Sequence, residues 1–283
     1  MSLLRIPAWV RPHLYPGKSF SDLTDSEVQK LRSDLARFSP ENPLVSVVIP
    51  AWNEENNIYR TLSSLAASTT TKDVEIIVIN NNSTDGTQQV LDRLGVRSFL
   101  QPVQGTPHAR QLGLEKARGH YHLCADSDTF YPPKWIDLMV EPMLTDSSIT
   151  GVYGIYSFIP PVGQSRIGLF FYERAARMVS MFRKRKKEFM NVYGFNMGFV
   201  TEVGRETGGF QVKGARVYAG VKGSDFRNEA EDGRMALNLQ KKGRLQQVTH
   251  PEACVFTSSR RLMDDGSIAK AFFNRVKRSL SIN

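Results

Sequence analysis

Two pairs of acidic residues have a spacing and a setting that suit metal binding and proton transfer. Asp126 and Asp128 lie one residue apart at the end of the apolar run YHLC, beside a turn. Two such carboxylates can bind a hard divalent cation through oxygen, and a diphosphate would supply further ligands. The cation would neutralise the diphosphate as it leaves. Aspartate is also favoured in turns, so this pair alone fits a turn cap as well.

The second pair, Glu231 and Asp232, opens a helical pattern that continues through MALNLQKKG. A helix start stabilises a carboxylate in its charged form, which suits a general base for an attacking hydroxyl group. A helix cap would explain the same residues equally well.

Such residues need a scaffold, and the apolar runs predict an α/β fold with a mostly parallel central sheet flanked by helices. The runs VSVVIP, VEIIVIN and YHLCAD are typical of strands covered on both faces, and helical patterns separate them. This alternation predicts parallel strands with right-handed connections and a ligand crevice at their carboxyl ends. The predicted strands span 45–50, 74–80, 97–102 and 121–126, and the predicted helices span 55–68, 87–94 and 106–118.

The flanking regions are less regular. We predict an N-terminal arm over 1–43, a catalytic domain over 44–262 and a C-terminal tail over 263–283. The arm contains a helical pattern from 25 to 38 that Thr24 or Asp25 could cap. In the second half, we predict strands over 151–159 and 252–256, helices over 166–188 and 228–242, and a glycine-rich bend over 194–209.

Composition narrows the class of protein. The 283 residues are 41% hydrophobic and 23% charged, which is typical of globular proteins. There is no run of about 18 apolar residues and no pattern of a secretion signal, so we expect a cytoplasmic protein. Cys124 and Cys254 lack the paired spacing of a zinc site and are predicted to be buried thiols. The net charge of +9 would attract nucleic acid, an anionic membrane or substrate phosphates, and charge alone does not choose among them.

Six motifs in order resemble family 2 glycosyltransferases. They are SVVIPAWNEENNI, VINNNSTDGT, ARQLGLEKARG, DSD, GGF and EDGRMALNLQKKGR, and they cover most of the chain from Val45 to Arg261. The resemblance implies a GT-A type nucleotide-binding fold and a nucleotide-sugar donor. It also implies Mn²⁺ or Mg²⁺ as cofactor and a single displacement with inversion at the anomeric carbon. The acceptor would be a glycan or a lipid-linked molecule in surface polysaccharide or glycolipid synthesis.

The resemblance also suggests roles on the donor side. A first loop made of Pro50, Ala51, Asn53 and Glu54 would contact the nucleotide. Arg110, after the third predicted strand, would approach the donor. Asp126 would contact the ribose or the sugar, and Asp128, with Asp126 beside it, would hold the metal.

On the acceptor side, the resemblance makes Asp232 the general base, with Glu231 beside it holding or contacting the acceptor. The glycine-rich segments 194–198 and 208–210 resemble the acceptor-side wall, where glycine lets backbone approach a substrate. Simple turns would account for these glycines too.

Two positions depart from the family pattern. Asn80 stands where members usually have an aspartate that reads the base, and an amide both donates and accepts hydrogen bonds. This leaves uridine, guanosine and thymidine donors open. The histidine that many members carry near the domain end is replaced here by Arg260 and Arg261, whose guanidinium groups could clamp the diphosphate. A solvated basic turn is the alternative.

The predicted helix 166–188 is amphipathic and ends in the basic run 183–187. Such a helix can lie on an anionic membrane, at the inner face in a cytoplasmic protein. We favour the interpretation that its apolar face packs on the core, because most amphipathic helices bury their stripe within their own domain.

Three rival functions follow from the same features. A nucleotidyltransferase would need a glycine-rich triphosphate loop after the first strand, and PAWNEEN has no glycine. A nucleic-acid-binding protein would fit the charge, but the acidic pairs would repel a phosphate backbone, so we expect no nucleic-acid partner. A catalytically inactive nucleotide-sugar-binding protein is disfavoured because Asp128 and Asp232 are both present.

Overall fold

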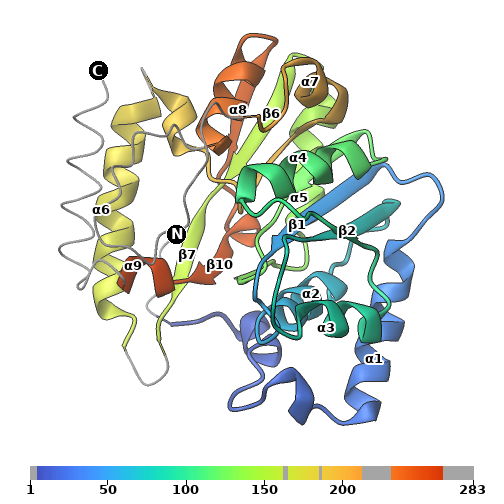
Figure 1. Ribbon diagram of the computed structural model, residues 1–283. Helices are drawn as coiled ribbons and strands as arrows, with labels where there is room; N and C mark the ends of the chain where they lie inside the picture. The colour runs from blue at the N-terminus through green and yellow to red at the C-terminus, as the bar shows by residue number, and fades with distance from the viewer. Residues whose placement is uncertain (1–4, 162–164, 185–186, 212–230, 264–283) are drawn as a thin grey trace.

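The structure, a computed structural model, describes residues 5–161, 165–184, 187–211 and 231–263. In this part of the chain, a seven-stranded sheet forms the centre, with helices on both faces (Figure 1). Its order is β3 (Ser98–Leu100), β2 (Val74–Asn80), β1 (Val45–Ala51), β4 (Tyr121–Cys124), β8 (Met197–Val200), β6 (Ile149–Gly154) and β9 (Arg244–Val248). Neighbouring strands are parallel except at β8, which is antiparallel to β4 and β6. The predicted α/β fold with a mostly parallel sheet is confirmed.

Helices cover the sheet in two layers. One face carries α1 (Asp25–Leu35), α2 (Ile58–Ala66), α3 (Thr87–Leu94) and α5 (Trp135–Thr145). The other face carries α4 (Thr106–Lys116), α7 (Thr201–Glu206) and α8 (Glu231–Gln240). Short 3₁₀ helices span Ala8–His13, Phe20–Asp22, Ala36–Phe38, Glu188–Asn191 and Pro251–Ala253.

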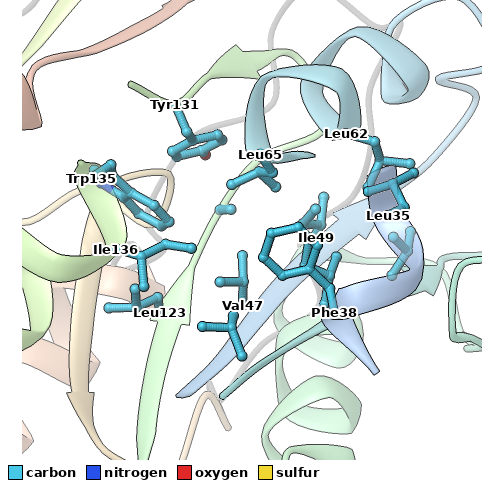
Figure 2. Close-up of a cluster of buried hydrophobic side chains, with 14 of the residues drawn as sticks. Leu35, Phe38, Val47, Ile49, Leu62, Leu65, Leu123, Tyr131, Trp135 and Ile136 are labelled. Carbon is cyan, nitrogen blue, oxygen red and sulfur yellow. The ribbon is translucent and has the colours of Figure 1, made fainter. Parts of the chain in front are cut away.

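The core explains why β1 is apolar along its whole length. Val47 and Ile49 face the layer of α1, α2 and α5, where Leu62 and Trp135 pack around them (Figure 2). Val48 faces the opposite way, toward Ala109 of α4. A strand buried on both faces needs apolar residues at consecutive positions, so the pattern in the sequence reflects this position in the sheet.

Local signals fix several helix ends. Thr24 caps α1: its hydroxyl accepts the Glu27 N–H, and the Glu27 carboxylate accepts the Thr24 N–H at 2.8 Å. Gly95 ends α3 in the left-handed conformation, with φ 67°. The predicted cap of α1 is therefore confirmed at Thr24.

The predicted single strand over 151–159 is wrong. The chain forms β6 and then β7 (Tyr156–Ile159), which belongs to a second sheet with β10 (Val255–Ser258) and β5 (Thr129–Phe130). Asn196 causes the break: its backbone C=O accepts the Gly154 N–H, and its side-chain amide donates to the C=O of Ile155 at 2.8 Å. Those contacts draw the chain out of the central sheet, and a side chain at Gly154 would collide with Asn196.

The predicted glycine-rich bend over 194–209 is also wrong, because it contains β8 and α7. Gly198 lies in β8 against Leu123, and a Cβ there would come within 2.4 Å of the leucine Cδ2. Gly204 lies in α7 against the ring of Phe199 in the same way. Glycine serves here for close packing of regular elements, and positive φ angles occur at Gly208 and Gly209, after α7.

The predicted helix over 166–188 forms α6 (Ile167–Lys184), and its apolar side chains divide between two surroundings. Leu169 and Tyr172 are buried, as the packing interpretation requires. Phe171 and Phe182 are exposed, the latter by 76%. Among the described residues, no helix is both long enough and apolar enough to span a bilayer.

Cys124 and Cys254 are buried, and both are free thiols, as predicted. Burial raises the pKa of Cys124 to about 12 and also raises that of Cys254. A thiol in this state is protonated at neutral pH and therefore a poor nucleophile. The predicted tail lies outside the described residues from position 264 on. Residues 228–230, the start of the predicted helix 228–242, also lie outside them, and the described part of that helix is α8.

Candidate active site

A cleft of about 570 Å³ lies at the carboxyl ends of β1 and β4, where the sequence placed the ligand crevice. It brings together most of the predicted site residues from segments far apart in the sequence. These are Pro50, Ala51, Asn53, Glu54, Arg110, Asp126, Asp128, Glu231, Asp232 and Arg260.

The loop after β1 is held by the turn after β2. Asn53, in the left-handed conformation with φ 53°, accepts the Thr84 N–H on its side-chain oxygen at 2.8 Å. The N–H groups of Asn53 and Glu54 donate to Ser83 and Thr87, at 3.1 and 2.9 Å. These bonds preorganise the loop that the sequence assigned to the nucleotide.

The turn that carries Asp126 and Asp128 is fixed from beneath. The Asp126 N–H donates to the Tyr131 hydroxyl at 2.8 Å, and that hydroxyl donates to the C=O of Phe195 at 3.0 Å. The Thr61 hydroxyl of α2 donates to the C=O of Ser127 at 2.8 Å. Because the backbone is bonded on both sides, the two carboxylates project from a fixed frame.

Arg110 is buried and bonds both to Asp126 and to the backbone of Gly194. Only 5% of its side chain is exposed; one guanidinium nitrogen pairs with Asp126 at 2.8 Å, and another donates to the C=O of Gly194 at 2.7 Å. A Cβ at Gly194 would lie 2.3 Å from the guanidinium, which explains the glycine. These bonds orient the Asp126 carboxylate, and the contact of Arg110 with the donor stays a prediction.

Asp232 begins α8 together with Glu231, and both line the cleft. The two oxygens of Asp232 accept the N–H groups of Gly194 at 2.9 Å and Gly233 at 2.8 Å. Burial and the charge of Glu231 raise the pKa of Asp232, while Arg110 and the two N–H groups oppose that shift. A carboxylate with a raised pKa accepts protons more readily, which suits a general base.

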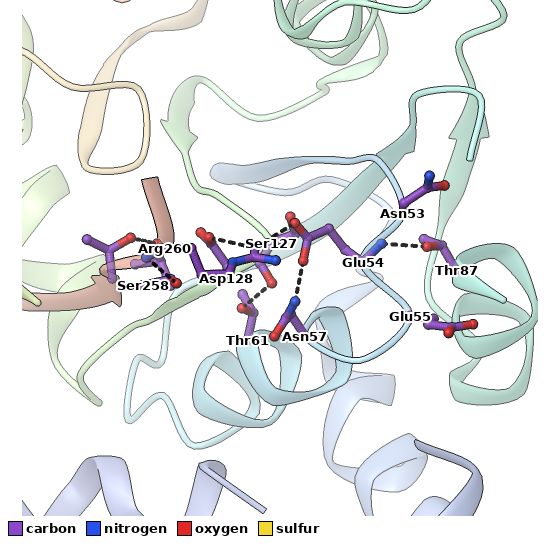
Figure 3. A network of polar contacts seen from close by, with 12 residues as sticks. Asn53, Glu54, Glu55, Asn57, Thr61, Thr87, Ser127, Asp128, Ser258 and Arg260 are labelled. Carbon is purple, nitrogen blue, oxygen red and sulfur yellow. Dashed lines mark hydrogen bonds and ion pairs between the residues drawn. The ribbon is translucent and has the colours of Figure 1, made fainter. Parts of the chain in front are cut away.

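Arg260 lines the same cleft and bridges two acids. Its Nη2 lies 2.9 Å from Oε1 of Glu54 and 2.9 Å from Oδ2 of Asp128 (Figure 3). Burial raises the pKa of Glu54, and the charge of Asp128 adds to the rise while Arg260 opposes it. Arg261 lies in α9 (Arg260–Met263), but its side chain is outside the described part of the structure.

Asn80 is the predicted residue that the structure does not bring to the cleft lining. The residue is 4% exposed, and its side chain donates to Gln88 at 2.9 Å and accepts the Ser83 N–H at 3.0 Å. The next residue, Asn81, lines the cleft instead and accepts the Gly105 N–H at 2.7 Å. Asn80 is the last residue of β2 and Asn81 the first residue after it, so the side chains of the two have different partners.

The carboxylates of the cleft suit a metal ion that a substrate also binds. Among the described residues, no group of three or more histidine, cysteine, aspartate or glutamate side chains could hold a metal ion. Asp128 and Glu54 nevertheless place carboxylate oxygens around one cationic nitrogen. Mg²⁺ and similar ions are commonly bound by one or two carboxylates with substrate phosphates and water completing the shell, so the residues fit such a metal.

Several residues of the cleft lining were not predicted from the sequence, among them Trp52, Thr106 and Tyr193. Phe195, which also borders the cleft, lies in the predicted acceptor-side segment 194–198. The rings of Tyr193 and Phe195 stack with centroids 5.6 Å apart and planes 15° apart. Trp52 lies between the predicted residues Ala51 and Asn53, and Thr106 begins the predicted helix 106–118, so these positions after a strand and at a helix start were the available signals.

A comparison with known families gives one match. The sequence profile described as "Glycosyl transferase family 2" matches residues 46–205, which is more than half of the chain. The matched segment includes the β1 loop, Arg110 and the Asp126–Asp128 turn.

Curated proteins with similar sequences are glycosyltransferases. A chondroitin synthase of Pasteurella multocida is 33% identical over 126 residues, which are 43% of this chain and 13% of that protein. A β-1,3-glucosyltransferase of Escherichia coli, named for UDP-Glc and α-D-GlcNAc-diphosphoundecaprenol, is 32% identical over 107 residues, 36% of this chain and 42% of that protein. The chain therefore spans less than half the length of these relatives.

Solved structures agree on the fold. A mannosyltransferase of Pyrobaculum calidifontis, in complex with GDP-Man and Mn²⁺, superposes with a TM-score of 0.55 at 17% identity, covering 88% of this chain and 70% of that one. Glucosyl-3-phosphoglycerate synthase of Mycobacterium tuberculosis, with Mn²⁺ and UDP-glucose, gives 0.52 at 19% identity, covering 86% and 79%. At such identities the likeness shows a GT-A fold.

Proposed function

Because the chain belongs to glycosyl transferase family 2, we propose that it moves a sugar from a nucleotide-sugar donor to a hydroxyl group of a glycan or lipid-linked acceptor. The observation that carries the proposal is one cleft that holds both Asp128, in the turn after β4, and Asp232, at the start of α8. A transferase of this kind needs a charge-stabilising group for the leaving diphosphate and a base for the attacking hydroxyl.

The donor half of the proposal rests on the β1 loop and the Asp126–Asp128 turn. Asp128, with Asp126 beside it, would hold Mn²⁺ or Mg²⁺ on the donor diphosphate. When bound, the metal supplies positive charge to the leaving group. Arg260 lies beside Asp128, where its guanidinium can also bind a phosphate oxygen.

The acceptor half rests on Asp232 and its surroundings. Its carboxylate would take the proton of the acceptor hydroxyl as the oxygen attacks the sugar carbon on the face opposite the diphosphate, which inverts the configuration. The N–H groups of Gly194 and Gly233 orient that carboxylate. Tyr193 and Phe195 offer flat rings at the same cleft, which suits a sugar unit in the acceptor.

A binding panel tests the donor site. UDP-, GDP- and dTDP-sugars with and without Mn²⁺ are measured by thermal shift and donor hydrolysis on the wild-type protein and on Asp128→Ala. We expect one nucleotide class to raise Tm in a metal-dependent manner, because ligand binding to the folded state stabilises it, and we expect the Asp128→Ala variant to lose this response.

The matched control is Asp34→Ala, which removes an exposed carboxylate paired with Lys30 on α1. It should respond to the nucleotide as the wild type does. A folded wild-type protein that responds to no nucleotide, with or without Mn²⁺, would overturn the proposed function.

A further inference from the structure

Glu54 and Asp128 share a single cationic position, and Arg260 fills it. One nitrogen of Arg260 lies 2.9 Å from an oxygen of each acid (Figure 3). Both carboxylates are largely withdrawn from solvent, at 14% and 20% exposure, whereas the Arg260 side chain is 55% exposed. The two acids are fixed and the cation lies on the open side.

The Glu54 carboxylate and the Asp128 backbone are held independently of Arg260. The second oxygen of Glu54 accepts the Asn57 amide at 2.6 Å, and the C=O of Asp128 accepts the Ser258 N–H at 3.2 Å. Two carboxylates this close repel each other, so their arrangement requires a positive charge between them. A different cation could satisfy the same requirement.

Arg260 is free to leave without disturbing the fold. Its backbone N–H is anchored on the Ser258 hydroxyl at 3.2 Å, so only the side chain has to rotate. Arg110, the other arginine among the described residues that line the cleft, is 5% exposed and bonded to Asp126 and Gly194. The cleft therefore combines one fixed guanidinium with one exposed guanidinium at the carboxylate assigned to the metal.

We propose that Arg260 is a resident cation that keeps metal off Asp128 until the donor arrives, and that the metal–diphosphate complex displaces it. The inference rests on the proposed function, because it assigns Asp128 to the metal. A metal ion without a nucleotide has to displace the bound guanidinium from Asp128, and it gains only a few protein ligands by doing so. A metal ion that carries a diphosphate brings its own ligands and gives the displaced guanidinium an anion to bind. Metal and donor consequently bind together.

Mn²⁺ binding measures this exchange without catalysis. Free Mn²⁺ is followed by electron paramagnetic resonance during titration of the wild type, Arg260→Gln and Arg260→Lys, each alone and with UDP or GDP. In the absence of nucleotide, we expect Arg260→Gln to bind Mn²⁺ at least about tenfold more tightly than the wild type, because two acids lose their counter-ion. Arg260→Lys keeps the charge and should stay near the wild type. In the presence of the nucleotide that the wild type binds, Arg260→Gln should no longer bind Mn²⁺ more tightly than the wild type.

Lys134→Gln is the matched control, since it removes one exposed positive charge paired with Glu252 outside the cleft lining. Arg260→Gln, Lys134→Gln and the wild type could instead bind Mn²⁺ with equal affinity while Mn²⁺ binding still depends on nucleotide. That result would overturn the proposed displacement of Arg260 and leave the proposed function standing. Absence of Mn²⁺ binding from all the proteins, with either nucleotide, would overturn the exchange and the proposed metal-dependent function together.

Discussion

Replacing Asp232 by asparagine is expected to lower kcat by about 10²- to 10⁴-fold and to leave donor binding nearly unchanged. The substitution keeps the shape of the side chain but removes the oxygen that would take the acceptor proton. Donor binding should persist because the β1 loop and the Asp126–Asp128 turn are held by their own hydrogen bonds. Steady-state kinetics and nucleotide thermal shifts on the same preparation measure the two effects.

The pH dependence gives an independent check on the same residue. Burial and the charge of Glu231 raise the pKa of Asp232, so its protonated form persists to a higher pH than in an ordinary aspartate. The wild-type kcat should therefore fall as the pH decreases through this raised pKa. The residual activity of Asp232→Asn should lack that limb.

Asp146→Asn is the control, since Asp146 is an exposed acid that pairs with Arg244 at 2.6 Å, outside the cleft lining. It should keep wild-type kcat. Asparagine at 232 retains only one acceptor for two N–H groups. We therefore expect the free energy of unfolding to fall by about 1 kcal/mol, with a modest decrease in Tm. Full turnover by a folded Asp232→Asn protein would remove Asp232 from the mechanism.

Replacing Glu75 by alanine is expected to lower the free energy of unfolding by about 3–5 kcal/mol, because it removes a fully buried carboxylate that accepts two hydrogen bonds and pairs with two partly exposed arginines. Glu75 lies in β2 with no exposed surface. Its carboxylate accepts the Ser46 hydroxyl at 2.6 Å and the Arg118 backbone N–H at 2.7 Å, and it pairs with the side chains of Arg97 and Arg118.

The network also joins the sheet to the segment before β1. Arg118 donates to the carbonyl groups of Pro40 and Glu41, at 3.0 and 3.2 Å. Without Glu75, the Ser46 hydroxyl and the Arg118 N–H lose their acceptor inside the protein, which is the costly part of the change. Urea unfolding of Glu75→Ala and Glu75→Gln measures the loss.

Glu206→Gln removes an exposed acid paired with Lys242 and should change the free energy of unfolding by less than about 1 kcal/mol. Glu75→Gln keeps the volume of the side chain. A large loss of unfolding free energy in that variant would therefore come from the missing charge and not from a cavity. Stability of both Glu75 variants within the range of Glu206→Gln would show that the network contributes nothing.

The sequence predicted the first half of the fold well because its elements alternate in strict order. Strands β1, β2 and β4 are continuous apolar runs, and their helices follow within short turns, so local patterns and topology agree. The carboxyl ends of these strands had to meet at one edge of the sheet. That placement of the β1 loop beside the Asp126–Asp128 turn is confirmed.

The second half was predicted less well because its signals are not local. The helix α5 contains Pro142 and went unrecognised, and β9 reads RLQQV, with too few apolar residues for a strand prediction. The segment 151–159 looks like one strand, and only Asn196, about forty residues further on, divides it. Glycines that seemed to mark a bend pack β8 and α7 against their neighbours.

The sequence by itself determined the family and the α/β class and indicated the candidate acids, because these depend on residue types in a fixed order along one chain. Only the tertiary structure decided what those acids face. Folding buried Asn80, set Arg110 behind Asp126 and placed Arg260 between Glu54 and Asp128. Partners separated by up to 206 residues leave no local pattern, since charge pairing depends on distance in space and not on spacing in the sequence.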